Sequence, residues 1–230
     1  MIKLENITKE YITDAGPVKA LNGIDLSIPD GEIIAITGQS GSGKSSLMNV
    51  IGCLDSPTSG RYFIDTADIG SLSDFQLSRL RGKIFGFIFQ SYNLLPVYTV
   101  FENVELPLIL NKINKKDRMQ KVNQAIEWVG LTNKRNSKPN MLSGGECQRT
   151  AIARALVHDP VLVMADEPTA NLDAENSHNI MKILTKLNKE LDTSFVFATH
   201  DEKIMGYLKR IIRLEDGNIV NDKKITKENI

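Results

Sequence analysis

The stretch Gly38-Gln39-Ser40-Gly41-Ser42-Gly43-Lys44-Ser45 decides the fold of this chain. It follows the apolar run 33–37, which is typical of a buried parallel strand, and it precedes apolar residues at helical spacing between 47 and 54. A strand, a glycine loop and a helix in this order are the setting that the phosphate-binding pattern G-x-x-x-x-G-K-[ST] requires. The sequence therefore predicts a nucleotide phosphate loop within an α/β fold.

The residue types of this loop suit a phosphate group. Its glycines adopt backbone angles closed to other residues, and the start of the following helix adds unpaired N–H groups. We expect Lys44 to bridge the β- and γ-phosphates and the Ser45 hydroxyl to ligate Mg²⁺. A glycine-rich turn that binds nothing is disfavoured, because the full pattern and both flanking elements are present. The expected nucleotide contacts are Gly38, Gln39, Ser40, Gly41, Ser42, Gly43, Lys44, Ser45 and Ser46.

A pair of carboxylates, Asp166-Glu167, ends a second apolar run at 161–165. Ligands of parallel α/β sheets bind at the carboxyl ends of the strands, so the pair is expected at the ligand edge. Asp166 is the candidate Mg²⁺ ligand, and Glu167 is the candidate base that orients or deprotonates the attacking water. The alternative is a solvated acidic turn, and the complete phosphate loop elsewhere argues against it.

The stretch Leu142-Ser143-Gly144-Gly145-Glu146 predicts a helix start, because Ser143 and Glu146 have the spacing of a capping box. Capping alone does not require Gly144 and Gly145, since glycine costs about 1 kcal/mol relative to alanine inside a helix. The glycines leave the helix amides uncovered for a second phosphate-bearing surface. One chain does not easily bring two such helix starts to the same γ-phosphate, whereas two chains arranged head to tail do.

Composition sets outer limits on the function. The chain has 230 residues, with 28 Lys plus Arg against 28 Asp plus Glu, a balance that does not indicate a nucleic-acid partner. No apolar run approaches the roughly 18 residues of a membrane helix, and residues 1–5 lack the apolar core of a secretion signal. Any action on a membrane is therefore expected through another polypeptide. Cys53 and Cys147 lack metal-ligand spacing and suit a reducing cytosol.

Short strands predict a small antiparallel sheet beside the main one. Strands are expected at 2–12 and 18–28 with a turn at 14–17, and another strand pair is expected around Ser59-Gly60. A further hairpin is expected at 211–217.

The middle of the chain is predicted to be helical, from about 91 to 158. A helix after an Asp117 cap is indicated by apolar residues at helical spacing up to Val129. Strands alternating with helices elsewhere predict a parallel sheet. We therefore expect an ATP-binding core with a β subdomain at 1–90 plus 159–230, and an inserted helical subdomain at 91–158.

The motifs taken together resemble those of ABC-type ATPases over nearly the whole chain. Residues 142–146 resemble the signature of that family, and Gln90 matches its glutamine loop. Asn171-Leu172-Asp173 resembles its D-loop, and His200 matches its switch histidine. Tyr11 lies where the family places an aromatic ring against adenine. The family's fold is the P-loop NTPase fold of the RecA-like type, with the two subdomains described above.

This resemblance implies a dimer in which ATP and Mg²⁺ lie between two chains. Gln90 would sense the γ-phosphate and approach the metal. Glu167 would activate water, and His200 would contact the γ-phosphate and help hold Glu167. Asp173 would couple the two sites, while the signature residues Ser143, Gly144 and Gly145 would act across the dimer. Cys147 departs from the Gln or Arg common in the family after the signature glutamate, and we interpret it as a small helix residue.

The segments 51–55, 101–108 and 165–173 resemble the macrolide-export and lipoprotein-release branch of the family. This implies an ATP-hydrolysing subunit at the cytoplasmic face of the cell membrane, bound to a transmembrane permease through the surface around 90–103. The expected cargo is a peptide, a lipoprotein or a drug-like molecule. One alternative is a cell-division type of ATPase that moves a membrane partner without transport. A DNA-repair or chromosome-organising ATPase is a weaker alternative, because the insertion is too short for a long coiled coil.

Overall fold

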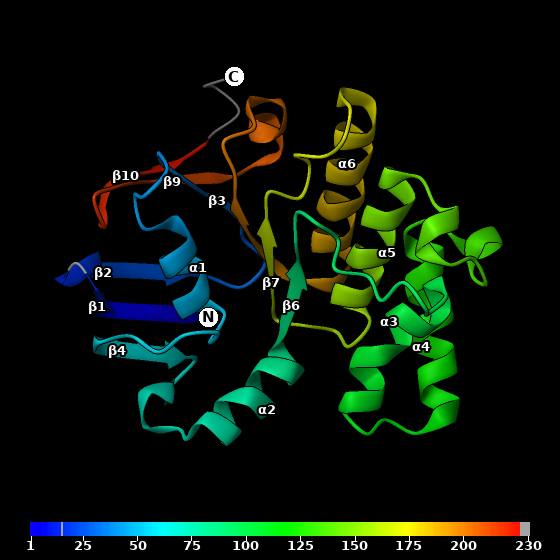
Figure 1. Ribbon diagram of the computed structural model, residues 1–230, viewed down its shortest axis with the longest axis horizontal. Coiled ribbons are helices and arrows are strands. Elements are labelled where there is room, and N and C mark those ends of the chain that lie inside the picture. Colours follow the sequence, from blue (N-terminus) through cyan, green and yellow to red (C-terminus); the bar gives the residue numbers. More distant parts are fainter. Residues whose placement is uncertain (15, 226–230) are drawn as a thin grey trace.

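The computed structural model describes residues 1–14 and 16–225, which form two sheets and the helices around them (Figure 1). The smaller sheet is antiparallel, with strand order β2-β1-β4-β5. Its strands are β1 (Ile2–Thr13), β2 (Gly16–Ile28), β4 (Ser59–Ile64) and β5 (Ala67–Asp68). This sheet confirms the antiparallel element that the sequence predicts.

The larger sheet carries the predicted parallel strands. Its order is β10-β9-β3-β8-β7-β6, and only the β9–β10 pair at one edge is antiparallel. A single strand, β8, separates β3 from β7, so the phosphate loop and the acidic strand end meet at one edge of the sheet. The strands are β3 (Ile33–Thr37), β6 (Phe85–Ile88), β7 (Leu162–Asp166), β8 (Ser194–Ala198), β9 (Arg210–Glu215) and β10 (Asn218–Lys224).

Helices cover both faces of the larger sheet. In Figure 1, α1 and the antiparallel strands lie on one side of β6 and β7, and α3 to α6 lie on the other. No helix among residues 1–14 and 16–225 is long and apolar enough to cross a membrane. The α-helices are α1 (Lys44–Ile51), α2 (Asp74–Ile84), α3 (Val100–Leu110), α4 (Lys115–Trp128), α5 (Gly144–Leu156) and α6 (Ala174–Leu191). Short 3-10 turns span Ile69–Ser71, Thr132–Lys134, Pro139–Met141 and Glu202–Tyr207.

The pleat of β3 divides its side chains between two cores. Ile33 and Ala35 pack with the helical side, whereas Ile34 and Ile36 pack with α1 and the antiparallel sheet. Successive side chains of a strand point to opposite faces, so a strand buried on both sides is apolar throughout. This explains the uninterrupted apolar run before the glycine loop.

Helix α5 belongs to the helical block and also packs on the parallel sheet. It contacts α3 and α4, and also β6 and α6. At Gly86 in β6, a side chain would collide with the carbonyl of Ala155, so glycine allows this close approach. The boundary between a core at 1–90 plus 159–230 and a helical subdomain at 91–158 stays a prediction.

Three local predictions need correction. The N-cap of α4 is Asn114, whose side chain accepts the backbone N–H of Asp117 at 3.1 Å, so Asp117 lies inside the first turn. Ser59 and Gly60 lie within β4 rather than between two strands. The first hairpin is tighter than expected, because β1 extends to Thr13 and β2 begins at Gly16.

Candidate functional site

The glycine loop connects β3 to α1, as the sequence predicts. The N-cap of α1 is Gly43, with φ 99° in the left-handed region, and no described side chain caps this helix start. A Cβ at Gly43 would lie 2.5 Å from the carbonyl oxygen of Ala20. Both the backbone angle and this contact require glycine. The N–H groups of the first turn are therefore not used by a side-chain cap and can serve a phosphate group.

The lysine of the loop holds the loop itself. Lys44 Nζ donates to the carbonyl oxygens of Gly38 at 2.6 Å and Gln39 at 2.7 Å. The carbonyl of Ser42 accepts the N–H of Gly217 at 3.0 Å, so the β9–β10 turn supports the loop from behind. The loop therefore has a defined shape in the chain alone.

Asp166 ends β7 beside the middle strand β8, where it pairs in register with Ala198. Burial raises the pKa of its carboxyl above the ordinary value, and repulsion from Glu167 adds to the shift, while Lys44 acts in the opposite direction. The structure thus brings Asp166, Glu167 and Lys44 into one electrostatic neighbourhood. A metal ion or a phosphate-bound cation there would favour the ionised form of Asp166.

Glu167 and His200 are in direct contact. Nδ1 of His200 lies 2.6 Å from Oε1 of Glu167, and the Thr199 hydroxyl donates to Oε2 at 3.2 Å. The backbone N–H of Glu167 donates to the carbonyl of Ala198 at 2.9 Å. The side chain of Glu167 is 17% exposed, whereas that of His200 is 81% exposed. The carboxylate is therefore held from several directions, and the histidine presents its outer edge to solvent.

Glu167 also has an unusual backbone conformation. Its φ is 45°, in the left-handed region that non-glycine residues adopt rarely. Strained angles of this kind occur often at functional sites, where the surrounding structure holds them. Here the hydrogen bonds of Thr199, His200 and Ala198 supply that support.

Gln90 follows β6 and is exposed. Its backbone carbonyl accepts Nδ2 of Asn171 at 3.0 Å, which links this loop to the segment before α6. Tyr92 and Asn93 follow Gln90 in the same loop. Arg154 of α5 donates to the backbone carbonyl of Tyr92 at 2.6 Å and to that of Asn93 at 2.5 Å. The loop around Gln90 is therefore fixed to two elements that the sequence places far away.

The start of α5 forms the predicted capping box. The backbone N–H of Glu146 donates to Oγ of Ser143 at 3.2 Å, and the N–H of Ser143 donates to Glu146 Oε2 at 2.8 Å. A Cβ at Gly144 would lie 3.1 Å from the Tyr92 hydroxyl, and one at Gly145 would lie 2.8 Å from Asn176 Oδ1. Packing within the chain thus gives the two glycines a reason that the sequence did not show.

Asp173 is the N-cap of α6 and also lies near the signature. Its carboxylate accepts the backbone N–H of Asn176 at 2.8 Å and Nδ2 of the same residue at 2.7 Å. The backbone N–H of Asn176 is the largest cause of the lowered pKa of this carboxyl. Since Asn176 also faces Gly145, Asp173 and the signature share one neighbour.

The predicted site residues fall into separate groups within one chain. Lys44, Asp166, Glu167 and His200 come together at the carboxyl edge of β3 and β7. The signature residues lie at the start of α5, and α1 and α5 are on opposite sides of β6 and β7 in Figure 1. Tyr11 lies on β1, where its hydroxyl donates to Asp55 at 3.0 Å.

Sequence reasoning missed Thr199 and Arg154 as supports of this site, and it named Asn171 only as part of the D-loop resemblance, without its bond to Gln90. Thr199 carries a local signal, because it lies between an apolar strand and His200. Asn171 and Arg154 bind a loop about 80 and 60 positions earlier, so no local pattern identifies these contacts.

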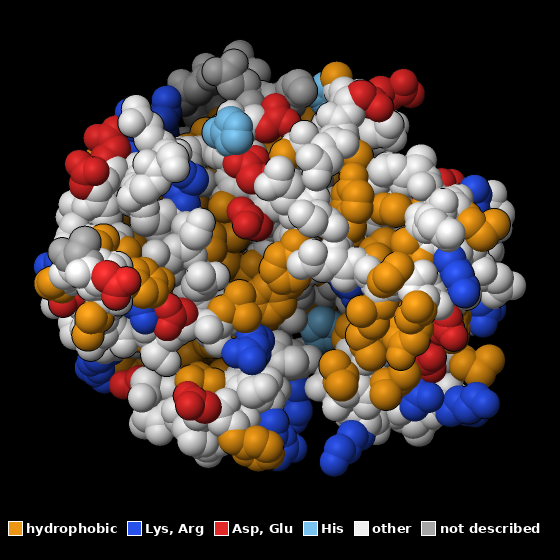
Figure 2. Space-filling view, viewed as in Figure 1, with side chains coloured by type: hydrophobic (Ala, Val, Ile, Leu, Met, Phe, Trp, Pro, Cys, Tyr) orange, Lys and Arg blue, Asp and Glu red, His pale blue; other side chains and the backbone are white. Residues whose placement is uncertain are grey.

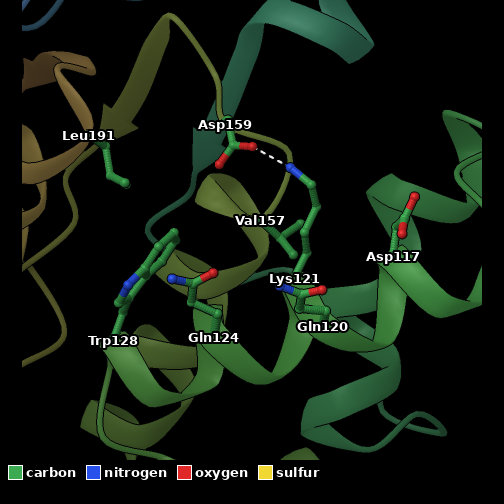
Figure 3. A pocket seen from close by; sticks show the side chains of 8 residues that line it. All are labelled: Asp117, Gln120, Lys121, Gln124, Trp128, Val157, Asp159 and Leu191. Carbon is green, nitrogen blue, oxygen red and sulfur yellow. Dashed lines mark hydrogen bonds and ion pairs between the residues drawn. The ribbon is translucent and has the colours of Figure 1, made fainter.

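A cavity of about 450 Å³ lies away from these groups, between α4 and the ends of α5 and α6 (Figure 3). An ion pair between Lys121 and Asp159 crosses one side of it, and Trp128 and Gln124 lie at the other end in Figure 3. None of the predicted site residues lines this cavity. We assign it no role in nucleotide chemistry.

The residues that follow the parallel strands β3, β6 and β7 have the chemistry to hold ATP with Mg²⁺. The uncapped start of α1 offers N–H groups to phosphate oxygens, and Lys44 supplies a cation. The hydroxyl of Ser45, the carboxylate of Asp166 and the side-chain amide oxygen of Gln90 are hard oxygen ligands of the kind that Mg²⁺ prefers. A glycine loop, an acidic strand end and a glutamate held by histidine on a parallel sheet define a P-loop nucleotide hydrolase.

Comparisons with known proteins place the chain more closely. The family model described as "ABC transporter" matches residues 21–170. YknY of Bacillus subtilis (strain 168), described as an uncharacterized ABC transporter ATP-binding protein, is 47% identical over 220 residues, covering 96% of this chain and 95% of YknY. The macrolide export ATP-binding/permease protein MacB of Campylobacter fetus subsp. fetus is 48% identical over 222 residues, covering 96% of this chain and 34% of MacB.

A solved structure is similar over almost the full length. It is a dimeric post-hydrolysis state of the ATP-binding cassette MJ0796 bound to ADP and Pi, a protein of Methanocaldococcus jannaschii. The TM-score is 0.88 at 41% identity, and the match covers 98% of this chain and 99% of that one. The chain belongs to the ABC transporter family, as an ATP-binding, ATP-hydrolysing domain with the P-loop NTPase fold.

Proposed function

We propose that this chain is the ATP-hydrolysing subunit of a membrane transporter that exports or extracts a peptide, a lipoprotein or a drug-like molecule. The proposal is supported by the 48% identity to a macrolide export protein that carries ATP-binding and permease parts in one chain. The match covers 34% of that relative, and the proposal adds a transmembrane permease as the partner of the ATP-binding part described here. The site of action is then the cytoplasmic face of the membrane.

The observation that carries the catalytic part of the proposal is the contact between Glu167 and His200. Oε1 of Glu167 accepts from Nδ1 of His200 at 2.6 Å, and Thr199 fixes the other oxygen. A carboxylate oriented in this way is suited to receive a proton from an attacking water. Lys44 and the amides of the glycine loop would stabilise the charge that develops on the phosphate oxygens. Mg²⁺, when bound, would neutralise phosphate charge, held by Ser45, Asp166 and Gln90.

The signature residues complete the site from a second copy in this proposal. The start of α5 lies across the sheet from α1, so in a head-to-tail dimer each phosphate loop would face the partner's signature. The dimeric state of the MJ0796 cassette, to which this chain is similar over 98% of its length, supports that arrangement. Ser143, Gly144 and Gly145 would then act across the interface, and Asp173 would couple the two sites.

The experiment that tests the catalytic part is Glu167→Gln. The amide keeps the size of the side chain but is not a base, so turnover falls about 10²–10⁴-fold while ATP binding is kept. The nucleotide would then hold two chains together, and size-exclusion chromatography with MgATP would show a dimer. Glu175→Gln, a carboxylate exposed at the start of α6, is the matched control and leaves turnover unchanged. A Glu167→Gln protein that stays monomeric with ATP would reject the sandwich.

The proposed permease surface lies in the segment after Gln90. Val97 is 70% exposed, Leu95 is 39% exposed and Tyr98 is 37% exposed. Figure 2 shows hydrophobic side chains gathered on the side of the molecule that carries α3. Phe101 is less accessible, because it packs against the helical core and lies 4.3 Å from the guanidinium of Arg135. Val97 and Tyr98 are therefore better probes of binding than Phe101.

The test of this surface is a pull-down with the neighbouring permease. Val97→Asp and Tyr98→Asp should weaken binding, while Val220→Asp, an exposed apolar residue on β10, serves as the control. Binding that survives both changes would reject the surface. Reconstituted vesicles then separate transport from the cell-division type of action, because only the transporter accumulates substrate.

A further inference from the structure

A network of three side chains joins Tyr11 to the segment that follows α1. The hydroxyl of Tyr11 donates to Asp55 Oδ2 at 3.0 Å, and Nζ of Lys9 donates to Asp55 Oδ1 at 2.6 Å. Lys9 also donates to the carbonyl of Ser56 at 2.8 Å. Both oxygens of one carboxylate are thus used by two residues of β1.

Asp55 is itself anchored to the end of the phosphate-loop helix. The backbone N–H groups of Leu54 and Asp55 donate to the carbonyl of Asn49 at 2.8 and 3.2 Å. On the other side, the N–H of Thr58 donates to the carbonyl of Thr8 at 2.8 Å. Asp55 therefore connects α1, which begins with the phosphate-binding lysine, to the strand that carries Tyr11.

The ammonium group of Lys9 and the carboxylate of Asp55 form an ion pair that is largely shielded from solvent. Lys9 is only 9% exposed, so its ammonium group needs a partner to offset the loss of water. Burial acts to raise the pKa of Asp55, but hydrogen bonds from Lys9 and Tyr11 outweigh it, and the pKa lies below its ordinary value. Asp55 is therefore ionised at neutral pH and holds both partners.

Lys9 also covers one face of the Tyr11 ring. Its Nζ lies 4.9 Å from the ring centroid, within the range of a cation–π contact. The two residues are two positions apart on β1, so their side chains leave the same face of the strand. Lys9 and Asp55 therefore fix the Tyr11 ring at two points, one ring face and the hydroxyl.

We propose that Asp55, with Lys9, is a positioning residue for the nucleobase: it fixes the Tyr11 ring relative to the phosphate loop so that the ring face away from Lys9 stacks on adenine. This inference rests on the proposed function and on the placement of Tyr11 against adenine that the family resemblance implies. The ring and the loop are then held at a set separation through α1. The network would add affinity for the base and nothing for the phosphates.

The test compares ATP with inorganic tripolyphosphate, which has the phosphates without a base. Asp55→Asn and Tyr11→Phe should each weaken ATP binding about threefold to tenfold, the size of one lost hydrogen bond. Both should leave tripolyphosphate binding unchanged. In turnover assays the KM for MgATP should rise by the same factor, with kcat unchanged, because the lost contact is equal in ground and transition states. Glu10→Gln, an exposed carboxylate between Lys9 and Tyr11, is the matched control.

The outcomes separate this inference from the proposed function. Equal weakening of ATP and tripolyphosphate would show a structural role and overturn the inference. Unchanged ATP binding in both variants would overturn it as well, while leaving ATP hydrolysis intact. If the unmodified chain binds tripolyphosphate and ATP equally well, the base makes no contact that adds affinity, and the inference is overturned. If it binds neither, the proposed function is rejected. Tyr11→Phe keeps the Lys9–Asp55 pair, so it carries the test if Asp55→Asn does not fold.

Discussion

The starts of α1 and α5 are both glycine-rich, yet they are built in opposite ways. At α1 the N-cap is Gly43 in a left-handed conformation, and no described side chain caps the helix. At α5 the N-cap is Ser143, and a capping box with Glu146 uses the N–H groups of Ser143 and Glu146 within the chain. The first start therefore has no side-chain cap and leaves its amides for a ligand, whereas the second is held in part by side chains of its own chain. A glycine-rich helix start alone does not say which of the two it is.

The largest effect is expected at Lys44, the first residue of α1, whose start has no side-chain cap (the open helix start). Lys44→Ala removes the cation at this start and with it a charge-assisted hydrogen bond to phosphate. ATP affinity should fall at least about 100-fold, and turnover should be lost with it. Fluorescent-nucleotide titration measures the affinity, and Lys182→Ala on the exposed face of α6 is the control. Normal ATP binding by Lys44→Ala would mean that the open start is not the phosphate site.

The next largest effect is expected at Gly145, in the first turn of α5, where the capping box of Ser143 and Glu146 lies. Gly145→Val should lower turnover roughly 100-fold, as for a lost transition-state donor, while ATP binding to the phosphate loop is kept. Gly206→Val is the control, because a Cβ at Gly206 meets nothing within 4 Å. Steady-state ATPase assays and nucleotide titration separate the two effects.

A double variant decides why Gly145 is glycine. A Cβ at this position lies 2.8 Å from Asn176 Oδ1, so Gly145→Ala combined with Asn176→Ala relieves the clash within the chain. The double variant should remain impaired if the glycine serves a partner copy. Recovered turnover would instead assign the glycine to packing within the chain.

The third prediction concerns the cap itself. Ser143→Ala removes the acceptor of the Glu146 N–H and should lower the free energy of unfolding by about 1 kcal/mol. Asn114→Ala at the start of α4 should cost a similar amount, since its side chain caps that helix in the same manner. Urea unfolding measures both. A Ser143→Ala protein with full stability and reduced turnover would show that the hydroxyl serves the ligand instead of the helix.

The smallest expected effect comes from the carboxylate near the open helix start. Burial and repulsion from Glu167 raise the pKa of Asp166, so its ionised form is less stable in the folded chain than in the unfolded one. The associated stability is present below the unfolded pKa and is lost as the pH rises through the folded pKa. Asp166→Asn should therefore stabilise the ligand-free protein at pH 7, by less than about 1 kcal/mol. Urea unfolding at pH 7 and pH 4 checks this, because the difference should shrink at the lower pH.

The sequence predicts most of the site because its signals are local. The glycine loop, the acidic strand end at Asp166 and the cap at Ser143 each depend on neighbours within a few positions. Asn114 and Asp117 show the limit of such signals, because both side chains can accept an N–H and the structure places the N-cap at Asn114. Long-range partners give no local pattern, so the bond of Tyr11 to Asp55 and the bonds of Arg154 to the loop after Gln90 appear only in the folded chain.

Lys44 has a consequence for how a ligand enters. Its ammonium group donates to two carbonyl oxygens of its own loop, and these bonds hold the curvature that the glycines allow. An arriving anion then exchanges one set of hydrogen bonds for another and does not have to organise a slack segment. The conformational entropy cost of ordering this loop falls on folding and not on binding. We therefore expect a ligand to bind and to leave quickly.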